Sequence, residues 1–87
     1  METIVVERVL DDPLDMEWLS TQRGQLVTCM QAHNVSLKHS YVSPDRKRMI
    51  CIYEAPDAES VRLALRTAGV LPFDNAWKAS ILRPQDL

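Results

Sequence analysis

The sequence predicts an α+β domain in which a four-stranded antiparallel sheet carries two helices on one of its faces. Three observations predict this class. Four stretches rich in β-branched and apolar residues alternate with two stretches of helical periodicity, in the order β-α-β-β-α-β. The chain has 87 residues, which is enough for one compact domain and too few for two. No repeat or linker divides it, so residues 1–87 are expected to form a single domain.

The first part of the chain predicts a strand followed by a long helix. Residues 3–9 are rich in β-branched side chains, and an Asp-Asp-Pro sequence ends that strand. Gly24 weakens the following helix, either because another element packs closely there or because the helix tolerates it. Asn34 is a suitable left-handed stop. Over residues 14–33 the apolar side chains recur at helical spacing, with an inward stripe of Met16, Leu19, Leu26, Val27 and Met30.

The rest of the chain predicts a hairpin, a second helix and a final strand. Residues 35–43 and 48–54 read as strands, and the Ser-Pro-Asp-Arg-Lys sequence between them favours a type I turn. Asp57 is placed to cap the N-terminus of the second helix, and Gly69 its C-terminus. The inward stripe of that helix consists of Val61, Ala64, Leu65 and Ala68, and the last strand covers residues 76–82.

This order of elements predicts the ferredoxin-like split βαββαβ fold, because two right-handed βαβ units then share one antiparallel sheet. Both faces of that sheet are largely apolar, since residues 49–53 are apolar at every position and residues 76–82 at most positions. Two helices on one side shield only one face. The second face is therefore expected to be a homodimer interface or a ligand pocket, and stacking of the open faces of two copies is favoured.

Composition narrows the possible partners. The formal net charge of -2 gives no general reason to expect nucleic acid. The basic hairpin tip at residues 46–48 has no aromatic partner, and residues 48–53 lack the aromatic motif of RNA-recognition domains. No stretch approaches the roughly 20 apolar residues that cross a bilayer, and the N-terminus carries no targeting pattern. The expected location is the cytoplasm, with Cys29 and Cys51 as free thiols rather than a disulfide.

Several short sequences carry a resemblance to a known family. They are Ser-Tyr-Val at 40–42, Cys-Ile-Tyr-Glu-Ala-Pro-Asp at 51–57, Val-Arg at 61–62 and Ala-Gly at 68–69, with weaker agreement at 4–8. In these the chain resembles a small ferredoxin-like family typified by a nickel-binding bacterial protein and mostly catalogued as a domain of unknown function. The resemblance implies a homodimer, with nickel bound by at least one member. Relatives often carry a histidine where this chain has Ala64, and their hairpin is usually shorter.

His39, Cys51 and Glu54 are the candidate ligands for nickel or another divalent transition metal. Imidazole is the commonest nitrogen donor for such metals, and a thiolate is a soft donor that could complement it. Pairing Tyr41 with Met49 would place His39 opposite Cys51, whereas a slip of one residue would separate them, and the sequence leaves the register open. The structural alternatives are a hydrogen-bonded strand histidine, a small buried hydrophobic cysteine, and an ion pair of Glu54 with Arg62.

Tyr41, Tyr53 and Trp77 are the candidate ligand-binding residues. They are expected to line an aromatic pocket on the open face, where hydroxyl groups and the indole N–H orient a small molecule. The alternative is that the same rings pack a dimer interface. Three functions follow: a metal- or ligand-binding homodimer, a cofactor-independent oxygenase or isomerase with His39 as acid and base, and a protein-interaction module. The first is favoured over an enzyme, although the fold alone does not choose among them.

Overall fold

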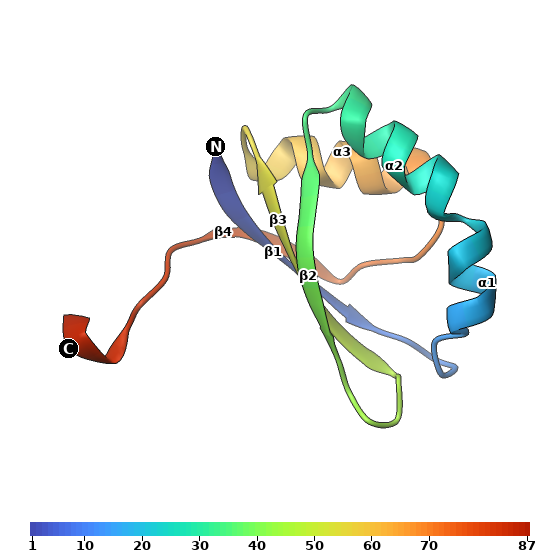
Figure 1. The fold of residues 1–87 in the computed structure, drawn as a ribbon, viewed down its shortest axis with the longest axis horizontal. Coiled ribbons are helices and arrows are strands. Elements are labelled where there is room, and N and C mark those ends of the chain that lie inside the picture. The colour runs from blue at the N-terminus through green and yellow to red at the C-terminus, as the bar shows by residue number, and fades with distance from the viewer.

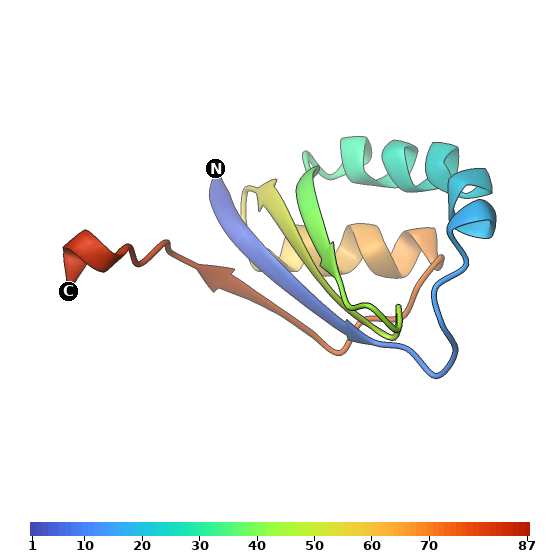
Figure 2. The same ribbon diagram turned by 60° about the horizontal axis from the view of Figure 1, so that its bottom comes forward.

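In the computed structural model, which describes residues 1–87, four strands form one antiparallel sheet and the helices lie on one side of it (Figure 1 and Figure 2). The elements are β1 (Glu2–Val9), α1 (Met16–Thr21), α2 (Arg23–Ala32), β2 (Ser36–Val42), β3 (Arg48–Ala55), α3 (Ala58–Ala68), β4 (Asn75–Ala79) and a short 3-10 helix, η1 (Pro84–Asp86). The strand order is β2-β3-β1-β4. This arrangement confirms the predicted ferredoxin-like class.

The core lies between the sheet and α3. Strand residues alternate between the two faces, so every second side chain of β1 and β3 is buried under the helices. The predicted inward stripe of α3 is confirmed, because its four residues are all buried. The buried apolar residues from the strands and from α3 that form this core are Ile4, Val6, Met49, Cys51, Tyr53, Ala55, Val61, Ala64, Leu65 and Ala76.

The prediction of one continuous helix over residues 14–33 is wrong, because the segment divides into α1 and α2 at Gln22. The backbone N–H of Gln22 bonds to the carbonyl of Leu19, three residues back. The hydroxyls of Ser20 and Thr21 donate to carbonyls of their own helix, and such bonds compete with the helical ladder. The helices that result are short, and no helix of the chain has the length and apolar character needed to span a membrane.

Three predicted helix ends are confirmed by the backbone geometry. Asn34 and Gly69 have positive φ angles of 58° and 62°, the left-handed conformation that stops a helix. Asp57 caps α3, since its carboxylate accepts from the Ser60 hydroxyl and from the Ser60 backbone N–H, each at 2.7 Å. These two hydrogen bonds hold the pKa of Asp57 below its ordinary value of 3.8.

The last strand is shorter than the predicted 76–82 because its partner ends. β4 pairs only with β1, and Ala79 lies opposite Thr3, close to the N-terminus of the chain. Residues 80–87, the C-terminal arm, leave the sheet and run away from the body of the molecule to η1 (Figure 1 and Figure 2). The large apolar side chains of Ile81 and Leu82 in this arm are exposed.

The helices cover three of the four strands. α3 packs against β1, β3 and β4, whereas α2 packs mainly against α3. β2 is left as an edge strand whose seven residues are all exposed. An apolar groove of about 500 Å³ lies between the first two helices and Leu37 of β2. The predicted two-layer arrangement is therefore incomplete along this edge.

Replacing Gly24 with alanine should stabilise the protein. A Cβ atom built at Gly24 meets nothing within 4 Å, so no element packs closely against this glycine. Alanine at this helical position should raise the free energy of unfolding by up to about 1 kcal/mol, measured by urea denaturation. Gly69→Ala is the matched control, because the φ of 62° at Gly69 strains a side chain and should make that variant less stable. Equal responses of the two variants would contradict this account.

Replacing Asp57 with alanine should destabilise the protein in a pH-dependent way. A carboxylate whose pKa is lowered by folding contributes stability above its ordinary pKa, and this contribution is lost as the pH falls through the folded value. The difference in unfolding free energy between wild type and Asp57→Ala should be full at neutral pH and shrink below pH 3.8. Asp57→Asn keeps an uncharged acceptor, so its advantage over Asp57→Ala should not change with pH. A wild-type advantage that stays constant in acid would contradict the carboxylate's role.

Candidate functional site

The face of the sheet that no helix covers, called here the open face, is a broad and largely apolar surface. Strand pairing places its side chains next to one another: Val5 lies opposite Ile52 on one side and opposite Trp77 on the other. The alternation of the strands assigns to this face Thr3, Val5, Glu7, Val9, Ser36, His39, Tyr41, Arg48, Ile50, Ile52, Glu54, Asn75, Trp77 and Ala79.

Large apolar side chains of the open face reach solvent. Tyr41, Trp77 and Ile50 expose 63%, 46% and 41% of their surface. The prediction that apolar side chains emerge from both faces of the sheet is therefore confirmed. A contiguous exposed surface of this kind is typical of an interaction site, because a monomeric protein seldom leaves so many neighbouring apolar groups in water.

The hairpin adopts the register that separates His39 from Cys51. His39 lies opposite Ile52, and Ser40 lies opposite Cys51, because the pairing shifts between Leu37 and His39. Since opposite residues share a face and consecutive residues do not, His39 is on the open face and Cys51 lies under the helices. The side chain of Cys51 is 3% exposed. The structure thus does not bring together the two residues that the sequence offered as a nitrogen and a sulfur ligand.

Glu54, the third candidate ligand, is on the open face and forms an ion pair. Its Oε2 lies 3.3 Å from Nζ of Lys38, whereas the sequence pointed to Arg62 as the partner. Arg62 instead contacts Glu59 and the carbonyl of Ala76. No group of three or more histidine, cysteine, aspartate or glutamate side chains in this chain is placed to hold a metal ion. His39 and Glu54 nevertheless share the open face on neighbouring strands.

The predicted aromatic pocket is wrong for one of its three residues. Tyr41 and Trp77 are on the open face, but they stand on the two opposite edge strands of the sheet. Tyr53 points to the other side and is 3% exposed, because it shares its alternation with the buried Cys51. The ring of Tyr41 packs edge-on against His39 at 5.2 Å, and the indole N–H of Trp77 donates to a side-chain oxygen of Glu7 on the neighbouring strand.

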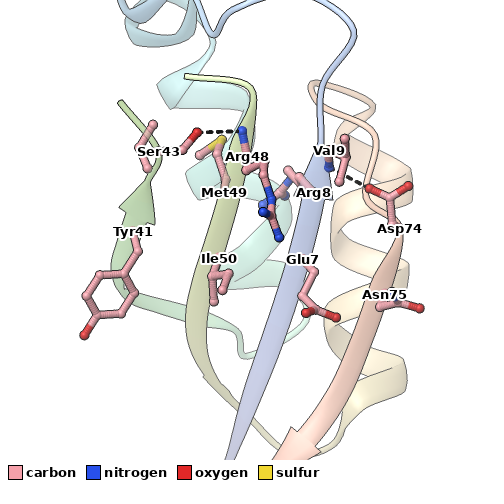
Figure 3. A pocket seen from close by; sticks show the side chains of 11 residues that line it. Glu7, Arg8, Val9, Tyr41, Ser43, Arg48, Met49, Ile50, Asp74 and Asn75 are labelled. Atoms are coloured by element: carbon pink, nitrogen blue, oxygen red, sulfur yellow. Dashed lines mark hydrogen bonds between the residues drawn. The ribbon is translucent and has the colours of Figure 1, made fainter. Parts of the chain in front are cut away.

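A groove of about 380 Å³ lies at the hairpin end of the sheet. Figure 3 shows Tyr41, Ile50, Glu7 and Asn75 side by side across the four strands that form it. Arg48 and Glu7 both line the groove, so it presents both signs of charge together with apolar side chains. Such a surface fits a small molecule with polar ends. His39 does not line this groove and is exposed, which disfavours the hypothesis of an oxygenase or isomerase with an enclosed histidine.

A buried polar cluster on the helix side of the sheet was missed by the sequence analysis. The guanidinium Nη1 of Arg8 donates to Sγ of Cys51 at 3.0 Å, and the hydroxyl of Ser40 donates to the same sulfur at 3.1 Å. Arg8 is 4% exposed, and its Nε is buried with no hydrogen-bond partner. The available signal was its alternation with the apolar residues Ile4 and Val6, which places Arg8 on the buried face.

Tyr53 borders this cluster as a neutral group. Burial raises the pKa of its hydroxyl above the ordinary value of 10.0, and the positive charge of Arg8 opposes that effect only in part. The phenol of Tyr53 is therefore protonated at neutral pH. It supplies polarity beside Arg8 and Cys51 but no negative charge.

Comparison with known proteins gives one family and a structural relative. The model of a family described as nickel responsive protein SCO4226-like matches residues 5–78, which include the segments at 40–69 that carried the resemblance. The crystal structure of SCO4226 from Streptomyces coelicolor A3(2) is similar with a TM-score of 0.77, covering 93% of this chain and 99% of that chain. At 16% sequence identity this similarity shows the fold alone. No curated protein matches the sequence.

Proposed function

The chain belongs to the SCO4226-like family of nickel-responsive proteins, and we propose that it is a cytoplasmic homodimer that binds nickel or a small ligand at its open face. The observation that carries the proposal is the row of exposed apolar side chains on a face that no helix covers, above all Trp77, Ile50 and Tyr41. Stacking two open faces removes these groups from water in both copies. A two-fold contact is self-complementary, so one apolar patch serves on both sides.

The C-terminal arm supports the same arrangement. It leaves the sheet directly after β4, the strand that carries Trp77, and runs away from the body of its own subunit (Figure 2). Ile81 and Leu82 in this arm are 67% and 70% exposed. Apolar side chains on an extended segment gain by packing against a second copy, since their own subunit leaves them largely exposed. The arm thus extends the proposed interface beyond the sheet.

In the proposed dimer the metal takes donors from both copies. One copy offers His39 and Glu54 on its open face and no set of three donors, whereas nickel prefers several nitrogen and oxygen or sulfur ligands. Stacking supplies a second His39 and a second Glu54 on the same interface. Ala64 stands where the resemblance to the family implied a histidine, and it is fully buried and supplies no donor.

A small ligand is the second candidate, and the groove at the hairpin end favours it. The side chains of Arg48, Glu7 and Tyr41 provide a cation, an anion and a hydroxyl around it. In isolation the groove is open to solvent, and a second copy stacked on the open face would close it. Closure would remove the apolar part of a bound molecule from water and strengthen its polar contacts.

Trp77→Glu should convert the dimer to a monomer. The substitution places a charge within the proposed interface, and burying an unpaired charge is strongly unfavourable. The wild-type protein should have twice the 9.9 kDa mass of the chain in sedimentation equilibrium, and Trp77→Glu should weaken association at least about tenfold.

Leu63→Glu is the matched control for that experiment. Leu63 is 45% exposed, nearly as much as Trp77, but it lies on α3 on the other side of the sheet. The control variant should remain dimeric. A wild-type protein of monomeric mass, or equal effects of the two substitutions, would contradict the proposed interface.

Added nickel should raise the melting temperature of the protein, because a ligand bound only by the folded state stabilises that state. The measurement needs protein purified without a histidine tag. His39→Ala should abolish the rise, whereas His33→Ala should retain it, since His33 ends α2 and is not on the open face. Trp77→Glu should also lose the response if the metal is shared between two copies. A nickel response that survives His39→Ala would remove this histidine from the site.

A further inference from the structure

Arg8 brings a positive charge into the interior with no carboxylate beside it. The ion pairs of the chain are all formed by other residues, and the Nε of Arg8 has no partner. A buried charge is unfavourable unless a group of opposite charge or strong hydrogen bonds compensate it. The neighbours that face the guanidinium are Cys51 and Tyr53. Of these two, the thiol sulfur is the group that accepts a hydrogen bond from the guanidinium, at 3.0 Å.

The sulfur of Cys51 sits between two donors from the flanking strands. Arg8 on β1 donates from one side at 3.0 Å, and Ser40 on β2 donates from the other at 3.1 Å. A hydrogen bond from a guanidinium to an ionised acceptor is about twice as strong as one between neutral groups. Two donors directed at one sulfur therefore stabilise that sulfur whenever it carries negative charge, which is the condition for a reactive cysteine.

We propose that Cys51, Arg8 and Ser40 form a peroxide-reactive thiol site. The thiolate sulfur attacks one oxygen of hydrogen peroxide, so that an S–O bond forms while the O–O bond breaks. The sulfur is oxidised by two electrons to sulfenic acid, and the departing hydroxide takes a proton from solvent to become water. Arg8 stabilises the negative charge as it moves from the sulfur to the leaving oxygen, and it does so without reorganisation because it is already in place.

A small oxidant would approach the sulfur from the edge strand. Cys51 is itself buried, but Ser40, whose hydroxyl contacts its sulfur, is an exposed residue of β2. Such a buried position favours a molecule as small as hydrogen peroxide over bulky thiol reagents. Cys51 and Ser40 lie on the side of the sheet away from the open face, whereas Arg8 also lines the groove at the hairpin end.

The other cysteine of the chain provides an internal control. Cys29 on α2 is more exposed than Cys51, and no donor contacts its sulfur. The folded protein is treated with hydrogen peroxide for timed intervals, catalase stops the reaction, and the chain is then unfolded in urea with excess dimedone, which traps sulfenic acid. Trypsin separates the cysteines into peptides 24–38 and 49–62. Cys51 should be labelled at least about tenfold faster than Cys29. Exposure alone predicts the opposite order, so faster or equal labelling of Cys29 would overturn the proposal.

Two substitutions test the donors. Arg8→Met replaces the buried guanidinium with an apolar side chain of similar length. Ser40→Ala changes an exposed position and should not affect folding. Each should slow the labelling of Cys51 about tenfold and leave Cys29 unchanged. Ser36→Ala is the matched control, because Ser36 is on the same strand but pairs with Glu54 of the open face. If Arg8→Met fails to fold, Ser40→Ala still tests the proposal. An unchanged rate of Cys51 labelling in Ser40→Ala would overturn it.

Discussion

The structure depends on the mismatch between a sheet that is apolar on both faces and helices that lie on only one of them. Along β1, Ile4 and Val6 face α3 while Val5 faces the open side, and β3 repeats this pattern next to it. Leaving a large apolar side chain in water instead of burying it costs about 1.5–3 kcal/mol. Several neighbouring side chains of this kind favour a second partner surface more strongly than any single polar contact in the chain does.

Local signals were sufficient to predict the fold but not its details. Asp57 and Gly69 mark the two ends of α3. The carboxylate of Asp57 accepts a hydrogen bond at the N-terminus, and Gly69 adopts the left-handed conformation at the C-terminus. The division of the first helix at Gln22 changes only a few backbone hydrogen bonds and leaves the apolar spacing of residues 14–33 intact. Periodicity therefore could not reveal it. The end of β4 at Ala79 depends on where its partner strand begins, which is information from a distant part of the chain.

The candidate site was harder to predict because it depends on which face each residue occupies. Tyr41 and Tyr53 look equivalent in the sequence, yet one is on the open face and the other is in the core. The buried position of Arg8 was not predicted, because a charged residue is usually on the surface. The donors to Cys51 are 43 and 11 residues away in sequence, so only the strand order β2-β3-β1 brings them to the sulfur.

One extra residue in β2 separates the candidate metal ligand His39 from the thiol of Cys51. Leu37 pairs with Tyr53, and an unbroken register from that pair would place His39 opposite Cys51. The bulge at Lys38 shifts the following residues by one, which turns His39 to the open face and brings the hydroxyl of Ser40 to the sulfur. The imidazole thus becomes available to a second copy of the chain, while the thiol keeps its donors under the sheet. Metal affinity and thiol reactivity then need not compete for the same two side chains.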